Sequence, residues 1–460
     1  MSKPKLMSDR VPFSLSGNCA AVAGRETGSF SDVRSAGLSS APQSLRVNVS
    51  WAFIGFAVYA ASQWATLAIV ARMCGPDGLG QFALALATTA PVMLLAGLEL
   101  RLVQSADSDQ KFAFAEYLAL RLIGIGVALS LIAAIGLFCG FDHLESSILI
   151  AVGFSKAAEA TADVFYGQFQ QRERMDLIAR SLILRSMISL GVFGFVIFVT
   201  KSLVAGIYAQ SIAWVVVLLL FDVPSLAQFL PSTWSEVVRS RMTSSHLWQL
   251  AILAMPAGLR TMLLSFESNI PFYVLRYFSD ERSLGVFAAM AYSLVIVQTF
   301  ARSLNQPAVP RFAILFGKRD QAAFAKLLWQ LCGMGLVIGL MGLAAAVVLG
   351  RVFLTIAYGR EFADESAILV ILMAACAVRM ITLPVAAAMA GSNQFVWLFR
   401  IQSLAVAVMG TSAVVLVPSL GLQGAAYSVL LVSIVMLGTH YVATRVFFRH
   451  SFGDVFLKRN

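Results

Sequence analysis

The sequence contains few charged residues, since Asp, Glu, Lys and Arg together occupy 13% of its 460 positions. About a quarter is usual in globular domains. Hydrophobic residues make up 59% of the chain, and its mean hydropathy is +0.80. This composition excludes a large soluble domain, and we expect most of the chain to lie within a bilayer.

Other absences exclude whole classes of site. No G-x-x-x-x-G-K-[ST] pattern occurs, so direct nucleotide-driven chemistry is not expected. Residues 1–46 are rich in Ser, Gly and Ala and lack the apolar core of a secretory signal, so we expect a disordered tail. The five cysteines show neither disulfide nor metal-ligand spacing and are interpreted as small packing residues: Cys19, Cys74, Cys139, Cys332 and Cys376.

Long apolar segments are what the sequence has in abundance. A hydrocarbon core about 30 Å thick is crossed by about 20 helical residues, and twelve segments supply that length. We therefore predict an all-α polytopic membrane protein. The predicted spans are 51–71, 80–99, 116–138, 147–169, 180–200, 203–221, 248–272, 284–305, 327–350, 365–389, 395–417 and 421–444.

Basic residues fix the expected orientation of these spans. With the amino terminus inside, the cytoplasmic segments and their flanks hold 25 of the 34 Lys and Arg, and the outer segments hold six. Short loops follow the positive-inside rule, so both termini are predicted to be cytoplasmic. The net charge of +10 then belongs to helix ends facing anionic lipid and does not indicate nucleic-acid binding.

An internal repeat divides the spans into two sets of six. Because six is even, both halves enter the membrane in the same direction, so the repeat is parallel. Transporters are commonly built as two such lobes, whereas membrane enzymes usually are not. We expect a tail (1–46), a first lobe (47–222), a cytoplasmic linker (223–247), a second lobe (248–446) and a cytoplasmic tail (447–460). The repeat pairs Leu79, Gly80, Phe82 and Ala83 with Leu284, Gly285, Phe287 and Ala288.

The first hairpin carries an ordered motif. It reads A-R-x-x-G-P-x-x-x-G-x-F and is followed by a helix ending in Gly-Leu. The motif residues are Ala71, Arg72, Gly75, Pro76, Gly80, Phe82, Gly97 and Leu98. This pattern resembles the polysaccharide-biosynthesis export family. That family comprises the oligosaccharide flippases of the multidrug/oligosaccharidyl-lipid/polysaccharide exporter (MOP) superfamily. Segments 167–175, 358–372 and 416–431 extend the resemblance in the same order.

The resemblance implies a function. Members move a polyprenyl-diphosphate-linked oligosaccharide across the bacterial inner membrane for O-antigen or exopolysaccharide synthesis. The implied partners are this lipid-linked oligosaccharide, membrane lipids and polysaccharide polymerase machinery. No cofactor is implied, apart from H⁺ or Na⁺ as a coupling ion. An ion gradient, the membrane potential or removal of product would supply the energy.

Charged residues within the spans are the first candidates for the site, because charge in the bilayer interior is costly. A diphosphate requires cations, and Arg offers bidentate hydrogen bonds to phosphate. We therefore select Arg260, Arg379 and Lys156. Arg302 and Asn305 follow at a predicted cytoplasmic helix end, where an anchoring role explains Arg302 equally well.

Acidic residues in the same spans are candidates for ion coupling. Glu159 and Asp163 share a helix face with Lys156, and the alternative is a structural ion-pair network. Glu267 shares a face with Arg260, in a helix that Pro256 and Pro271 are expected to bend or break. Arg379 either faces a water-filled cavity, which we expect, or pairs with Glu267.

Two other functions compete with this prediction. A drug or organic-cation antiporter of the same superfamily shares the architecture, but such pumps bind substrate through acidic residues, whereas this membrane interior carries both signs. An oligosaccharide polymerase or ligase requires a sizeable outer loop. The longest outer connections here, 351–364 and 273–283, have about a dozen residues, so we do not predict an enzyme.

Overall fold

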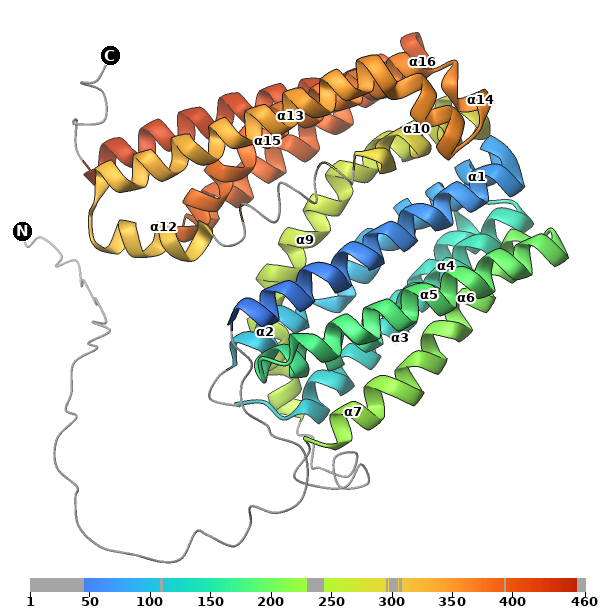
Figure 1. Ribbon diagram of the computed structural model, residues 1–460, viewed down its shortest axis with the longest axis horizontal. Helices are drawn as coiled ribbons and strands as arrows, with labels where there is room; N and C mark the ends of the chain where they lie inside the picture. Colours follow the sequence, from blue (N-terminus) through green and yellow to red (C-terminus); the bar gives the residue numbers. More distant parts are fainter. Residues whose placement is uncertain are drawn as a thin grey trace, which may run out of the picture. The chain divides into compact units, whose positions relative to one another are not determined.

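The computed structural model describes residues 45–107, 111–229, 244–294, 297, 305, 308–392 and 394–452. Within these residues the regular structure is entirely helical (Figure 1). The helices of the first half are α1 (Leu45–Gly97), α2 (Leu100–Ala106), α3 (Phe114–Phe138), α4 (His143–Gln171), α5 (Met175–Thr200), α6 (Leu203–Val217), the π-helix η1 (Leu218–Asp222) and α7 (Val223–Ala227). Those of the second half are α9 (Ser244–Phe278), α10 (Glu281–Ser293), α12 (Ala308–Gly317), α13 (Gln321–Ala357), α14 (Arg360–Ala363), α15 (Ser366–Gly391) and α16 (Phe395–Phe452).

Eight helical stretches among the described residues are long and apolar enough to cross a membrane. Two of them have double length, because α1 and α16 each contain two helices that meet at a kink. The kinks lie at Gly75 (φ 71°) and Gly421 (φ 54°), in a left-handed region that glycine enters without steric cost. The predicted all-α, two-lobed membrane architecture is confirmed.

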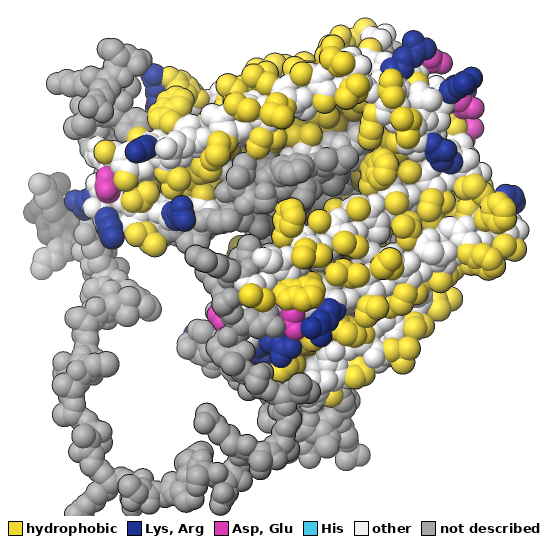
Figure 2. All heavy atoms as spheres, viewed as in Figure 1, with side chains coloured by type: hydrophobic (Ala, Val, Ile, Leu, Met, Phe, Trp, Pro, Cys, Tyr) yellow, Lys and Arg dark blue, Asp and Glu magenta, His cyan; other side chains and the backbone are white. Residues whose placement is uncertain are grey.

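The surface of the helices suits a lipid environment. On the face shown in Figure 2, hydrophobic side chains cover the lengths of the helices, and Lys and Arg gather at helix ends. Large apolar side chains point outward, such as Phe138 and Val348, which are 85% and 76% exposed. Exposing this apolar surface to water would cost much free energy, whereas contact with lipid acyl chains carries no such cost.

Some helices differ from the prediction. Pro256 and Pro271 both lie inside α9, which continues through them as one helix, so of the expected bend or break the break does not occur. Helix α12 lies between the predicted spans 284–305 and 327–350, in a segment counted as cytoplasmic for which no helix was predicted. In the predicted span 284–305, α10 reaches Ser293, and most of the residues after Leu294 lie outside the described part of the chain. Parts of the predicted tails and of the 223–247 linker lie outside the described residues.

Helix α9 contacts both halves of the chain. Leu250 and Ala254 in its first part join an apolar cluster formed by the N-terminal half. Gly258 packs on α1 so closely that an added Cβ would lie 2.9 Å from the Cα of Leu98. Farther along α9, Glu267 pairs with Arg379 of α15. A movement of α9 would therefore change packing and ion-pair contacts in both halves.

The two halves touch at the glycines that the sequence repeat aligned. A Cβ added to Gly80 would lie 3.1 Å from the backbone nitrogen of Gly285, and one added to Gly285 would lie 3.0 Å from that of Gly80. This reciprocal contact is what an approximate two-fold axis between the halves produces. Nearby, Gln81 Nε2 donates to Glu281 Oε2 at 2.9 Å and Arg72 Nε donates to the carbonyl of Ala357 at 3.2 Å. We call this set of contacts the outer seam, after the side of the membrane on which the predicted orientation would put it.

The outer seam provides a test of conformational change. We expect cysteines at positions 81 and 281, in a Cys74→Ser background, to be joined by a short bifunctional thiol reagent. If the protein is the flippase that the sequence resemblance implies, an alternating-access cycle opens this seam, so cross-linking is expected to stop export, and a cleavable linker should restore it on reduction. Polysaccharide export in treated cells is the measurement, with each single-cysteine variant as the control. Undiminished export in fully cross-linked protein would show that the seam never opens.

Candidate functional site

A cavity of about 360 Å³ lies within the N-terminal half, where helices α1 to α5 converge. Its walls carry four cationic and three acidic side chains, which leaves an excess of one positive charge. Aromatic rings from α1 and α4 complete the lining. The charged residues are Arg101, Arg121, Lys156 and Arg185, with Glu99, Glu159 and Asp163; the rings are Phe56, Tyr59 and Tyr166.

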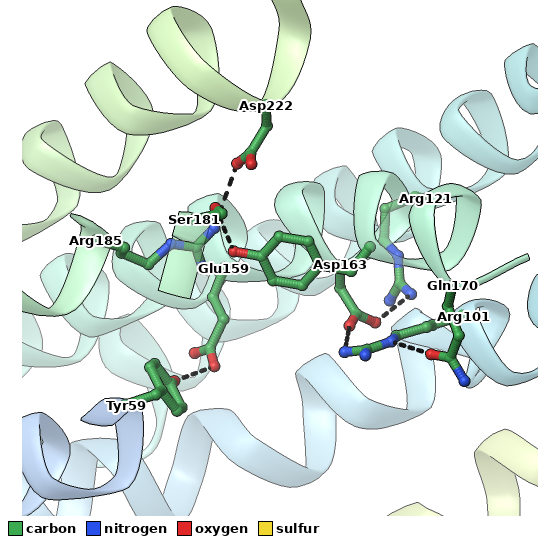
Figure 3. A network of polar contacts seen from close by, with 10 residues as sticks. Tyr59, Arg101, Arg121, Glu159, Asp163, Gln170, Ser181, Arg185 and Asp222 are labelled. Atoms are coloured by element: carbon green, nitrogen blue, oxygen red, sulfur yellow. Dashed lines mark hydrogen bonds and ion pairs between the residues drawn. The ribbon is translucent and has the colours of Figure 1, made fainter. Parts of the chain in front are cut away.

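Asp163 occupies the centre of the most basic part of this cavity (Figure 3). Arg101 Nη1 lies 3.1 Å from one of its carboxylate oxygens, and Arg121 Nη2 lies 3.4 Å from the other. Arg101 also donates from Nε to Gln170 at 3.1 Å and lies over the Tyr166 ring at 5.6 Å. One carboxylate thus bridges two guanidinium groups from α2 and α3, as a bound phosphate group would.

The backbone beside Arg121 is unusual. Leu98 and Glu99, at the junction of α1 and α2, both have positive φ (50° and 49°). A non-glycine residue in this region costs free energy, and such strain gathers at functional sites. A Cβ on the preceding Gly97 would overlap the Nη1 of Arg121. The Gly-Leu of the sequence motif therefore turns the chain and leaves room for a buried guanidinium.

A Gly97→Ala variant tests this arrangement. The new methyl group displaces the Arg121 head group, which lies at the end of a flexible side chain, so the fold should survive. For the flippase that the sequence resemblance implies, we expect export to fall by about tenfold or more, which corresponds to weakening a charged hydrogen bond. Protein abundance should match that of Gly126→Ala, because a Cβ at Gly126 on α3 meets open space. Equal export by the two variants would contradict the role given to Gly97.

Glu159 organises a second group in the same cavity. Lys156 Nζ lies 2.8 Å from its carboxylate, and the Tyr59 hydroxyl donates to the other oxygen. Arg185 lies deeper, 1% exposed, between the rings of Tyr166 and Trp214 at 5.4 and 5.3 Å. Its guanidinium is 4.0 Å from Asp222, at the end of the π-helix η1 (Figure 3). The predicted set of Lys156, Glu159 and Asp163 thus comes together with cations from three further helices.

The other predicted site residues lie elsewhere. Arg379 of α15 pairs with the buried Glu267 of α9 and donates from Nε to Ser433 at 3.0 Å. The expectation that Arg379 faces a water-filled cavity is therefore wrong. Its side chain, 24% exposed, pairs with Glu267, which was the alternative. Arg260 is exposed and interacts electrostatically with Glu99, at the N-terminal cavity. Asn305 is half-buried, and Arg302 lies outside the described residues.

The pair of Arg379 and Glu267 allows a stability prediction. Glu267 is 2% exposed, and an Arg379→Gln variant leaves its charge without a cation in the bilayer interior. We expect a loss of about 3 to 5 kcal/mol in stability, seen as low abundance and a lower melting temperature in detergent. The Arg379→Gln, Glu267→Gln double variant should recover most of it. A double variant no more stable than the single one would contradict the pairing.

Comparison with known proteins supports this architecture. No protein-family model matches the chain. A multidrug resistance transporter of the MATE family, solved inward-facing, superposes with a TM-score of 0.73 at 14% identity, covering 88% of this chain and 99% of that one. The lipid II flippase MurJ, in an inward closed conformation, superposes with a TM-score of 0.70 at 10% identity, covering 86% and 87%.

The chain has the fold of the MOP superfamily.

A sequence relative adds to the likeness in fold. The capsular polysaccharide biosynthesis protein CapF of Staphylococcus aureus is 24% identical over 326 residues, which are 71% of this chain and 80% of CapF. The resemblance to the polysaccharide branch of the MOP superfamily, drawn from the first-hairpin motif, is confirmed. Within this MOP fold, that motif supplies both the outer seam, through Gly80, and the cavity wall, through Gly97.

Three cations of the MOP-fold cavity were not among the residues selected from the sequence. Arg101, Arg121 and Arg185 were counted among the 25 Lys and Arg of the cytoplasmic segments and their flanks. One signal in the sequence could have pointed to Arg101. The run Gly-Leu-Glu-Leu-Arg at residues 97–101 interrupts an apolar stretch with two charged residues. It does not reveal which carboxylate, 62 residues away, receives the Arg101 guanidinium.

Proposed function

We propose that this protein is a flippase that moves a polyprenyl-diphosphate-linked oligosaccharide across the bacterial inner membrane for surface polysaccharide synthesis. The N-terminal cavity carries this proposal, because four cations converge there with three carboxylates. CapF is named for capsular polysaccharide biosynthesis and MurJ for flipping lipid II, and both relationships support the same substrate class. The proposed role is transport and not catalysis.

Substrate binding follows from the ion pairs in the cavity. A diphosphate entering between Arg101 and Arg121 would replace the Asp163 carboxylate and gain bidentate, charge-assisted hydrogen bonds. Lys156 adds positive charge within the same cavity, and Arg260 of α9, which does not line it, interacts electrostatically with Glu99 of the cavity wall. The rings of Phe56 and Tyr59 offer faces for sugar. The prenyl chain remains in lipid between the lobes.

Release of Asp163 gives a route to energy coupling. Once a diphosphate holds both arginines, the displaced carboxylate is free to take a proton or Na⁺. Glu159 and Glu267 remain further candidates, each already held by a cation. In this account the ion binds when substrate has neutralised the arginines and leaves when Asp163 pairs with them again. An Asp163 that never leaves its arginines would bind no ion.

The direction of transport follows from the outer seam. The described contacts between Gly80 and Gly285 and between Gln81 and Glu281 close one end of the interface between the halves. We assign this end to the periplasm, with both termini in the cytoplasm, from the distribution of Lys and Arg. The conformation described here then receives substrate from the cytoplasmic leaflet. Polysaccharide polymerase machinery would take the product on the other side.

A second candidate, an antiporter of organic cations, is favoured by the three carboxylates in the same cavity. Asp163 and Glu159 are both held by cations in this structure, which leaves Glu99 beside Arg260 as the remaining acid. The excess of positive charge disfavours a cationic ligand. Dye or drug efflux would have to overcome this repulsion.

Deletion of the protein from its host separates the two candidates. Mass spectrometry of lipid extracts should then show a complete prenyl-diphosphate repeat unit accumulating, together with loss of one surface polysaccharide. The same extract identifies the sugar. Unchanged lipid-linked intermediates with new sensitivity to cationic compounds would instead assign the protein to drug export.

A further inference from the structure

A second hollow, distinct from the charged cavity, lies along α16. This helix folds back on itself at Gly421, so its two halves run side by side. Between them is an open groove of about 270 Å³. Four residues at i, i+3, i+4 and i+7 line one wall and four from the returning half line the other. They are Trp397, Arg400, Ile401 and Leu404, opposite Gly438, Thr439, Val442 and Ala443.

The shape of this α16 groove depends on a glycine. A Cβ added to Gly438 would meet nothing within 4 Å, so the space above it is open. Ile401 and Ala443 are buried and form the floor, while Leu404 and Val442 are exposed and form the rims. The lining is almost wholly apolar. In a bilayer such a groove accepts a hydrocarbon chain.

One end of the α16 groove is cationic. Arg400 is exposed and its guanidinium lies over the Trp397 ring at 5.6 Å. Arg400 forms no ion pair with any residue that the structure describes, and no acidic residue lines the groove. Arg and Trp together near a helix end are typical of the membrane interface. A positive charge at the mouth of an apolar groove complements an anionic head group above a fatty chain.

We propose that the α16 groove is a binding site for an anionic phospholipid. One acyl chain lies along Ile401, Leu404 and Gly438, and the phosphate is held by Arg400. Basic pockets between transmembrane helices on the cytoplasmic side are suited to acidic lipid head groups. This site does not depend on the proposed flippase activity, because its ligand is a membrane phospholipid and not the transported molecule.

Native mass spectrometry of the purified full-length protein tests the site, with phosphatidylglycerol and phosphatidylcholine as probes. We expect one phosphatidylglycerol to bind in preference to phosphatidylcholine. Arg400→Gln should weaken phosphatidylglycerol binding by about fivefold, the contribution of one basic residue near a membrane surface. Gly438→Leu fills the groove and should weaken both lipids. Gly438→Ala, a smaller change, keeps the test usable if the leucine variant is unstable.

Two variants are matched controls. Arg180 lies over Trp51 at the same 5.6 Å but does not line the α16 groove, so Arg180→Gln should leave binding unchanged. Gly410 is equally open on the first half of α16 and does not line the groove, so Gly410→Leu should also bind normally. Equal loss in Arg400→Gln and Arg180→Gln would overturn the proposal. So would co-purification of a polyprenyl lipid in the groove in place of phosphatidylglycerol.

Discussion

An Arg121→Gln variant is expected to lower polysaccharide export by about 100-fold, the effect of removing one partner from a buried, hydrogen-bonded charge pair. Arg121 is 4% exposed and shares Asp163 with Arg101. Glutamine keeps much of the side-chain length but offers no positive charge to a diphosphate. Arg121→Lys should retain part of the activity, because it keeps the charge and loses the planar fork. Export is measured as surface polysaccharide per cell, normalised to protein abundance.

Loss of Arg121 also leaves Asp163 with fewer partners, so folding must be separated from transport. The Arg121→Gln, Asp163→Asn double variant removes one charge of each sign and should restore abundance. Its export should stay low, because the substrate-binding cation is still missing. Arg180→Gln is the control for loss of an arginine outside the cavity. Recovery of export in the double variant would show that the pair is structural.

A Gly285→Ala variant is expected to disable transport through the outer seam. The added methyl group would overlap the carbonyl oxygen of Pro76 and crowd Gly80, and both contacts are backbone. Overpacking of this kind costs about 1 to 3 kcal/mol, which shifts the balance between closed and open seam by about 5-fold to 150-fold. We expect export to fall and a cysteine at position 81 to react faster with an impermeant maleimide.

The matched control for this change is Gly333→Ala on α13, where an added Cβ meets open space. Both substitutions raise helix propensity by about the same amount, so any difference reflects the seam. Slow labelling at position 81 in Gly285→Ala, with normal export, would mean that the halves do not close through these glycines.

The features that could be predicted from the sequence are those that local composition determines. Twelve apolar runs gave the spans, because a bilayer requires a fixed helical length. The pairing of Leu79 and Gly80 with Leu284 and Gly285 indicated a repeat, and the two glycines indeed meet across the seam. Lys156, Glu159 and Asp163 were identified because charge within a span is rare.

Partners across helices could not be predicted in the same way. Arg260 and Glu267 share a face of α9, yet the partner of Glu267 is Arg379, which is 112 residues away. Arg101 and Arg121 were placed at the membrane edge because they follow or precede apolar runs. The left-handed turn at Leu98 and Glu99 ends α1 and begins the separate helix α2, whose Arg101 reaches the cavity. Such turns and side-chain directions depend on tertiary packing.

Helix α9 links the two elements of the account. Its first part packs on Leu98, beside the strained turn of the cavity, and its later part holds Arg379 through Glu267. A substrate that pulls on Arg260 therefore acts directly on an element shared by both halves, and one that pulls on Arg121 acts on α3, which contacts α9. This arrangement offers a physical route from an occupied cavity to an opened seam.

Translocation by the purified protein tests the central claim most directly. Proteoliposomes would carry a polyprenyl-diphosphate-linked oligosaccharide extracted from the deletion strain, and a sugar-cleaving enzyme outside the vesicles would report which molecules reach the outer leaflet. The account predicts that wild-type protein exposes nearly all of the lipid to the enzyme, while Arg121→Gln leaves the inner-leaflet half protected. Equal exposure with wild type, Arg121→Gln and protein-free vesicles would contradict it.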